Sequence, residues 1–155
     1  MYGFAIDYPD TWRIEFGPKS GRAEGYVAFR SPMKDRAFLT WGMLEKIRGR
    51  YNSLEAQAEA SLARIGTGGE VRKLKVTETE MTEVNGHRAI FNHFILDRAI
   101  GMRMVRLGSK EVWSIHLWCD KTERFFIVYE STPDPSRSPE QSLIFGHMKD
   151  SFVCH

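Results

Sequence analysis

Short segments of alternating apolar and polar residues predict antiparallel strands in the first third of the chain. Trp, Ile and Phe alternate with Arg and Glu over residues 12–16, which is typical of a strand with one buried face. Further strands are predicted over 3–7, 26–30 and 37–44, separated by turns and loops rich in Gly, Pro and charged residues. The charged residues 45–51 are predicted to form a basic connector.

Two segments have apolar residues at helical spacing. The first helix is predicted over 53–65, with Asn52 as its N-cap and an apolar stripe made by Leu54, Ala58, Leu62 and Ile65. The second helix is predicted to begin with Ser138 as its N-cap and Pro139 at the first helical position. Its apolar residues Ile144, Met148 and Phe152 recur every four positions and lie on one face.

Between the two helices the pattern predicts a block of strands. Asn85-Gly86 is the strongest hairpin signal in the chain, joining strands over 70–83 and 87–96. Three further strands are predicted over 102–107, 112–118 and 125–129, the first closed by a turn at Gly108-Ser109-Lys110. The strands at 87–96 and 112–118 are apolar at odd and even positions alike, so both of their faces should be buried.

The order of elements predicts the fold class. Short links between successive strands imply antiparallel pairing, and strands that are apolar on both sides require cover on both faces. We therefore expect an α+β domain over 1–155: a three-layer α/β/α sandwich with about six to eight strands and one helix on each face.

Three sequence segments resemble the PsbP-like family. The opening Tyr2-Gly3-Phe4-Ala5-Ile6-Asp7-Tyr8-Pro9-Asp10-Thr11-Trp12 is similar to the aromatic first strand, Tyr-Pro and tryptophan of these domains. Val84-Asn85-Gly86-His87-Arg88-Ala89 resembles their glycine turn before a long strand, and Met148-Lys149-Asp150-Ser151-Phe152 resembles their closing helix. The resemblance extends over nearly the whole chain as an order of elements.

The PsbP-like family includes the extrinsic PsbP subunit of photosystem II, a Ran-binding nuclear-import factor, bacterial DcrB-like proteins and Eag-type chaperones. What these proteins share is the fold, and they bind other proteins or ions. The resemblance therefore implies a non-catalytic binding or accessory module that engages a protein partner. The fold alone does not choose between these roles, and no functional residue is carried over, because none of the family's can be matched to this chain.

Composition and motifs weigh against several functions. The 22 basic and 20 acidic residues give a net charge of +2, whereas a dedicated nucleic-acid-binding domain is expected to be strongly basic. The sequence contains no Gly-x-Ser-x-Gly elbow and no phosphate-binding Walker loop. We expect no enzymatic activity and no cofactor, with an enzyme carrying an unrecognised site as the alternative.

Four residues are chemically able to hold zinc, namely His116, Cys119, Cys154 and His155. On a strand His116 and Cys119 face opposite sides, and Cys154 and His155 lie at the end of the sequence, so we expect no metal site. The two cysteines are expected to be free core thiols, with a disulfide between the sheet and the last helix as the alternative.

Basic residues gather in two connectors. Lys46, Arg48 and Arg50 follow the fourth predicted strand, and a second group, within 97–110, contains Arg98, Arg103, Arg106 and Lys110. If the two connectors lie at one edge of the sheet, they form a positive surface that attracts an acidic partner. The same residues are the candidates for weak nucleic-acid binding, the second alternative function.

Two further expectations concern location and assembly. No apolar run has the roughly 18 residues of a membrane helix. The chain is expected to be cytoplasmic if it is complete and exported if a leader has been removed. An uncovered edge strand of the sheet is the surface through which a homodimer would form.

Overall fold

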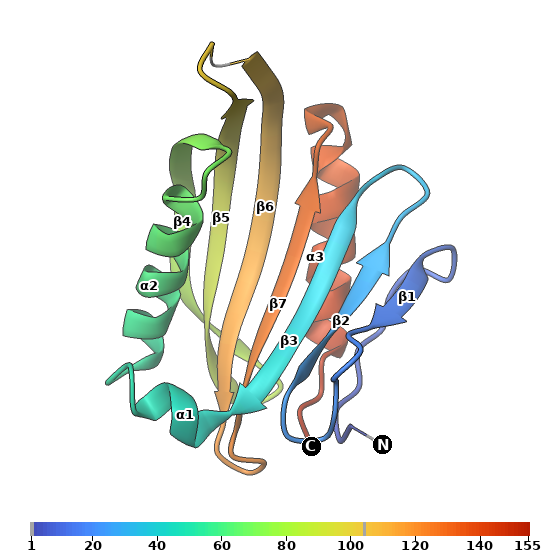
Figure 1. The fold of residues 1–155 in the computed structure, drawn as a ribbon. Coiled ribbons are helices and arrows are strands. Elements are labelled where there is room, and N and C mark those ends of the chain that lie inside the picture. The colour runs from blue at the N-terminus through green and yellow to red at the C-terminus, as the bar shows by residue number, and fades with distance from the viewer. Residues whose placement is uncertain (1, 104) are drawn as a thin grey trace.

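The computed structural model describes residues 2–103 and 105–155 and is built on one antiparallel sheet (Figure 1). The sheet has seven strands in the spatial order β1-β2-β3-β7-β6-β5-β4. Their bounds are β1 (Arg13–Phe16), β2 (Gly25–Arg30), β3 (Arg36–Met43), β4 (Val71–Val84), β5 (His87–Ile100), β6 (Val105–Cys119) and β7 (Arg124–Thr132). The strand number and the antiparallel pairing are those predicted from the sequence.

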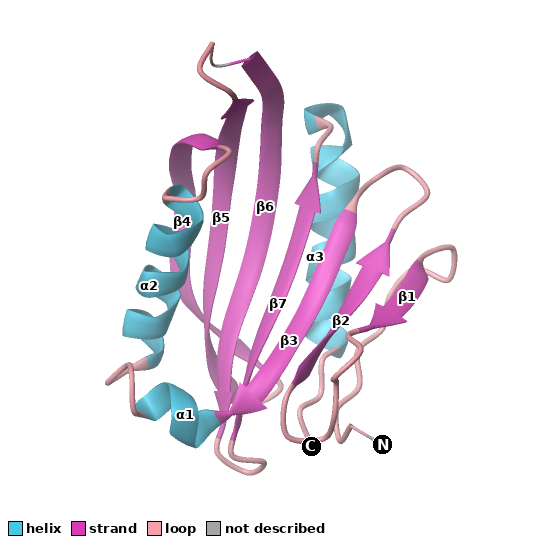
Figure 2. Ribbon diagram, viewed as in Figure 1, coloured by secondary structure: helices cyan, strands magenta, loops and turns pink. Residues whose placement is uncertain are grey.

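Three α-helices accompany the sheet: α1 (Leu44–Arg48), α2 (Leu54–Gly66) and α3 (Ser138–Ser151), the last preceded by the 3-10 turn η1 (Pro135–Arg137). Figure 2 shows α2 on one face of the sheet and α3 on the other, which confirms the α/β/α arrangement of the α+β class. No described helix combines the length and apolarity needed to cross a lipid bilayer.

The central strands are buried on both faces, as their sequences predict. On β6, Trp113, Ile115 and Leu117 belong to the large core beneath α3, whereas Val112 packs with Phe94 in a smaller cluster beneath α2. Because successive side chains on a strand point to opposite faces, these residues need cover on both sides. The two helices provide it.

The cover is unequal on the two faces. Helix α2 packs on β4, β5 and β6, whereas the part of the same face formed by β2, β3 and β7 has only the short helix α1 at one end (Figure 1). We call this uncovered part the open face. Its floor is the even-numbered side of β3 and the odd-numbered side of β7, because Phe38 pairs with Tyr129 and Thr40 with Ile127.

Two connectors differ from the prediction. Residues 45–48 of the predicted basic connector 45–51 belong to the short helix α1. Strands predicted separately over 102–107 and 112–118 are one strand, β6, and the chain reverses near Gly101, ahead of Val105. Gly108 has a φ of +83° where the β5–β6 register shifts, so the glycine serves a β-bulge within the strand instead of a turn.

The helix caps and the first strand also differ from expectation. Ser53, not Asn52, caps α2, since its Oγ accepts a hydrogen bond from the Ala56 amide. Ser138 is the first residue of α3 and not its cap, because η1 runs directly into the helix. Residues 3–7 form only an isolated bridge, between Ala5 and Val153.

The end of α3 is attached to two distant parts of the chain. Ala5 and Val153 exchange backbone hydrogen bonds of 2.8 and 2.9 Å, and the Asp7 amide donates to Ser151 Oγ at 3.0 Å. Asn85 lies in the β4–β5 turn with a φ of +47° and donates through Nδ2 to the Phe152 carbonyl. These bonds place the last residues beside the ends of β5 and β6.

A buried polar cluster lies beneath the start of α3. Asp35 is fully buried and accepts hydrogen bonds from Arg137 Nε and Nη2 at 3.1 and 2.8 Å. Glu130 on β7 is also fully buried, and neither carboxyl oxygen has a partner among the described residues. Burial, and next the charge of Asp35, raise the pKa of Glu130 to about 9, so this carboxyl is neutral at pH 7.

This cluster predicts a stability that falls as pH rises. The pKa of Glu130 is about 4.5 in the unfolded chain and about 9 in the fold. At pH values between these two, the folded state holds one proton more than the unfolded state. The free energy of unfolding should therefore decrease across this window, by up to roughly 1.4 kcal/mol per pH unit. Glu130→Gln, which cannot ionise, should flatten this dependence in urea unfolding curves measured from pH 5 to 9. Glu59→Gln, at an exposed helix position, should leave it unchanged; equal slopes in Glu130→Gln and the parent protein would contradict the assignment.

Candidate functional site

Half-buried apolar side chains line the open face. Phe38 on β3 and Tyr129 on β7 lie side by side with ring centroids 6.3 Å apart, and Ile127 continues the row. Phe125 lies across Gly42, where a Cβ would meet its ring at 2.5 Å. The glycine thus leaves room for an aromatic ring to lie over the sheet at a position with no covering helix.

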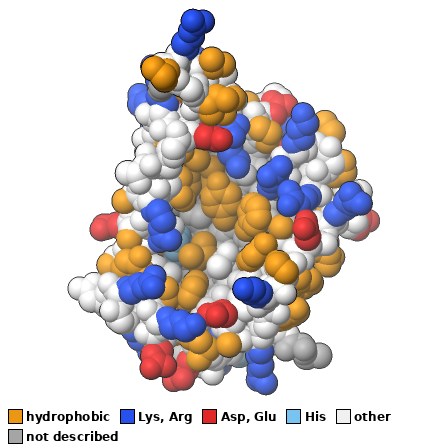
Figure 3. All heavy atoms as spheres, viewed as in Figure 1, with side chains coloured by type: hydrophobic (Ala, Val, Ile, Leu, Met, Phe, Trp, Pro, Cys, Tyr) orange, Lys and Arg blue, Asp and Glu red, His pale blue; other side chains and the backbone are white. Residues whose placement is uncertain are grey.

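Seen from outside, this surface is apolar at its centre and basic around it. Figure 3 shows hydrophobic side chains gathered over the middle of the face, with Lys and Arg side chains around them and scattered Asp and Glu side chains between these. Tyr26, on the neighbouring strand β2, is 44% exposed and extends the apolar area toward the edge of the sheet. Exposed apolar patches with a polar rim are typical of interaction sites.

Three cations stand together at one end of this surface. Lys110 of β6 lies over the Tyr129 ring, with Nζ 6.0 Å from the ring centroid. Its pKa is lowered, first by burial and then by the charges of Arg98 and Arg36. Within the described ranges no carboxylate lies within 4.0 Å of any of these three groups. The three cations therefore form no ion pair among the described residues.

The predicted basic surface is not one patch. Lys46, Arg48 and Arg50 lie at or just after α1, near the end of β6, whereas the second group lies at the opposite end of the same strand (Figure 1). The first group is also partly neutralised. Lys46 pairs with Glu24 at 2.7 Å, and Arg48 pairs with Asp120 at 2.5 Å while its guanidinium lies 5.7 Å from the Trp118 ring centroid.

The second group divides between the open face and the far tip of the β5–β6 hairpin. Arg98 and Lys110 belong to the three-cation cluster, while Arg103 and Arg106 are exposed at the tip. Sequence reasoning missed Arg36, the third member. The signal was present, because Arg36 has the same parity on β3 as Phe38 and therefore lies on the same face.

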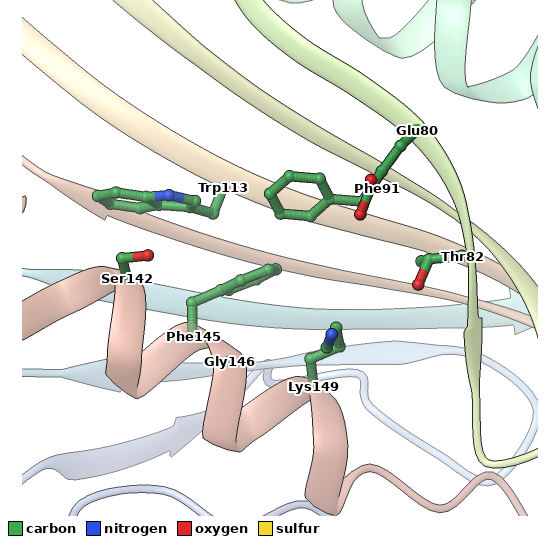
Figure 4. Close-up of a pocket in the computed structure, with 8 residues that line it drawn as sticks. All are labelled: Glu80, Thr82, Phe91, Trp113, Ser142, Phe145, Gly146 and Lys149. Atoms are coloured by element: carbon green, nitrogen blue, oxygen red, sulfur yellow. The ribbon is translucent and has the colours of Figure 1, made fainter. Parts of the chain in front are cut away.

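Two buried groups with large pKa shifts, His116 and Glu130, lie away from the crevice between α3 and the sheet. His116 is 2% exposed, and burial, then the charge of Arg64, lower its pKa to about 4. A crevice of about 180 Å³ between α3 and strands β4 to β6 has Phe91, Trp113 and Phe145 on its walls (Figure 4). Its polar lining residues are Glu80, Thr82, Ser142 and Lys149. Neither His116 nor Glu130 is among the residues that line this crevice.

The zinc-capable residues are distributed differently from the expectation. His116 faces α2, on the opposite side of β6 from Cys119, as strand geometry requires. Cys119, Cys154 and His155 do converge, contrary to the expectation from their spacing, and His87 joins them as a residue that sequence reasoning missed. Both cysteines are free thiols in this structure.

The edges of the sheet are β1 and β4. Strand β4 carries alternating exposed charges, among them Lys73, Lys75, Glu78 and Glu80, and has register shifts near Val71 and Val76. Charges and bulges on an edge strand disfavour pairing with a second copy. Association through this edge is therefore not favoured by its sequence.

Comparison with known proteins gives structural matches only. No protein-family model and no curated protein sequence matches the chain. Among solved structures, cyanobacterial PsbP (CyanoP) from Synechocystis sp. PCC 6803 aligns with a TM-score of 0.58 and 13% identity, over 99% of this chain and 88% of that one. LpqN of Mycobacterium tuberculosis, described as involved in cell envelope biogenesis, aligns with a TM-score of 0.58 and 11% identity, over 97% and 82%. PA94 of Pseudomonas aeruginosa, of unknown function, aligns at 0.56 and 12%, over 94% and 85%.

The chain has the PsbP-like fold. Identities of this size establish the fold alone. Within the PsbP-like fold, the three segments whose sequences carry the resemblance meet in space: Ala5 bonds to Val153, and Asn85 bonds to Phe152. Each of the three segments thus contains a residue that helps to attach the end of α3 to the sheet.

The three-cation cluster predicts that Lys110 lowers the stability of the fold. Lys110→Met keeps an apolar stem on Tyr129 and removes a charge that is partly desolvated and repelled by Arg98 and Arg36. The melting temperature at pH 7 should rise by about 1–2 °C, equivalent to roughly 0.5 kcal/mol. Lys75→Met on the exposed edge strand is the control and should change the melting temperature less. A lower melting temperature for Lys110→Met than for the parent protein would contradict the electrostatic argument.

Proposed function

We propose that this chain is a non-catalytic binding module whose open face holds an acidic and apolar segment of a protein partner. The observation that carries the proposal is the combination, on a part of one face that α2 leaves uncovered, of an aromatic floor and a group of cations without ion-pair partners among the described residues. The PsbP-like fold supports an accessory or binding role without naming a partner.

The aromatic floor supplies the apolar part of the argument. Phe38, Ile127 and Tyr129 are half-buried by their neighbours and keep part of their surface in water. Covering such side chains contributes roughly 25 cal/mol per Å² of apolar surface removed from water. Aromatic residues at the centre of a patch with a polar rim are the usual anchors of protein interfaces.

The cations supply the selectivity. Arg36, Arg98 and Lys110 lie close enough to lower the pKa of Lys110, so a carboxylate placed among them would relieve mutual repulsion. Complementary charge accelerates association and disfavours partners of the wrong sign. A segment that combines Asp or Glu with large apolar residues therefore fits this face better than a purely apolar one.

The two alternative functions have weaker support. The basic connectors proposed for nucleic-acid binding lie at opposite ends of β6 and do not form a continuous basic track. An unrecognised enzyme would be expected to hold its shifted titratable groups in a cleft, whereas His116 and Glu130 are buried in the protein core.

Selection from a display library of random peptides tests the binding proposal. Peptides retained by the immobilised chain should be enriched in Asp or Glu next to aromatic or aliphatic residues. In fluorescence titrations, the double variant Arg36→Glu/Lys110→Glu should bind a selected peptide with an affinity at least about tenfold lower. Raising the salt concentration should lower the affinity of the parent protein for the same peptide. Phe38→Ala should weaken it without changing the salt dependence.

A matched control has the same change in charge on the other side of the sheet. Lys73→Glu/Lys75→Glu alters two exposed residues of β4 whose neighbours on β5, Asp97 and Ile95, lie on the face that α3 covers. This variant should bind the selected peptide like the parent protein. Equal loss in both double variants, selection of basic peptides, or retention of RNA or anionic vesicles in place of peptides would overturn the proposal.

A further inference from the structure

Four side chains from three distant parts of the sequence converge at the end of the sheet. His87 is the first residue of β5 and Cys119 the last of β6; Cys154 and His155 follow α3. Ala89 pairs with Leu117, and the same register continued by two residues places His87 opposite Cys119 on the face beneath α3. The bridge between Ala5 and Val153 brings Cys154 to the same point.

The potential ligand atoms of these four residues all lie within 4.8 Å of one another. His155 Nδ1 lies 3.4 Å from Cys154 Sγ and 3.9 Å from Cys119 Sγ. The two sulfurs are 2.6 Å apart, and the rings of His87 and His155 are 5.2 Å apart at 79° to each other. Zinc bonds of about 2.3 Å to sulfur and 2.0–2.1 Å to nitrogen place tetrahedral ligand atoms roughly 3.3–3.8 Å apart. A zinc ion therefore requires the two sulfurs to move apart from their separation of 2.6 Å.

We propose that His87, Cys119, Cys154 and His155 bind a zinc ion. Two thiolates and two imidazoles are the donor set of closed tetrahedral zinc sites, in which four protein ligands leave no position for substrate. The site would therefore be structural. It would fix the residues after α3 to the paired ends of β5 and β6, and binding would release the two thiol protons.

One cation lies beside the two thiols, whereas burial disfavours ionisation there and raises the pKa of Cys154 to about 12. The Arg124 guanidinium lies close enough to both cysteines to interact with their charges, and it donates to the carbonyls of Tyr2 and Gly3 at 2.6 and 2.9 Å. Lys121 Nζ contacts His155 Nε2 at 3.1 Å, on the side of the ring away from the sulfurs. Since Lys121 is exposed, its ammonium group is free to turn outward when Nδ1 holds the metal and Nε2 carries the proton.

Titration of the full, tag-free chain with Zn²⁺ alone and with Co²⁺ alone under reducing conditions tests the site. We expect one metal ion per chain, a rise in melting temperature on zinc addition, and a Co²⁺ spectrum with the ligand-field bands of tetrahedral coordination and thiolate charge transfer. His87→Ala and His155→Ala should each lower the affinity for zinc by at least about 100-fold. This is the upper end of the loss seen when a residue that only supports a metal ligand is removed.

His147→Ala is the matched control, because this exposed histidine on α3 lies outside the cluster; it should bind zinc like the parent protein. Circular dichroism of each variant separates loss of ligands from loss of fold, and Cys154→Ser should reduce the thiolate charge transfer, because one of the two thiolates is removed, while retaining the sheet. Counting free thiols before and after reduction addresses the competing Cys119–Cys154 disulfide, and a chain that binds zinc only after reduction supports the proposal. A reduced, folded chain that binds no zinc, an octahedral Co²⁺ spectrum, or equal losses in His147→Ala and His87→Ala would overturn it.

Discussion

The structure depends on the double-sided burial of β5 and β6. Their side chains are apolar on both faces, so each face requires cover of its own, and the cost of leaving residues such as Phe94 and Trp113 in water is roughly 1.5–3 kcal/mol each. Helix α3 meets this requirement with the largest core of the molecule. Helix α2 meets it only over β4, β5 and β6, which leaves β2, β3 and β7 with only the short helix α1 at one end of that side. The proposed binding surface is therefore the part of the sheet that this second helix does not reach.

The same requirement explains why the last residues of the chain lie where they do. For α3 to cover the core, Met148 and Phe152 must both be buried, and the helix end is held by Ala5, Asp7 and Asn85. The chain that follows then lies at the ends of β5 and β6, where His87 and Cys119 are neighbours. The proposed zinc site follows from the way α3 is attached to the sheet.

Local sequence signals account for most of the fold and for little of the candidate sites. Asn85-Gly86 and the stripe from Leu54 to Ile65 depend on neighbouring residues and predict a hairpin and a helix that the structure contains. The structure around Gly108 cannot be predicted from its neighbours, because a glycine with positive φ is compatible with a turn and with a β-bulge. Pairing with the neighbouring strand β5 determines which of the two forms. The sites depend on pairing across the sheet. Arg36 lies near Lys110 only because of the strand order β3-β7-β6, and His87 lies near Cys154 only because the end of α3 is attached to the sheet.

The central claim is that the open face is the surface where a partner binds, and amide NMR chemical shifts measure this residue by residue. Addition of an acidic, aromatic peptide obtained by selection should shift the amide signals of β3, β7 and the adjoining part of β6, with the largest changes around Phe38, Ile127 and Tyr129. Signals of α3 and of β4 should stay in place. Shifts concentrated in the crevice between α3 and β4, or along the β4 edge, would contradict the account.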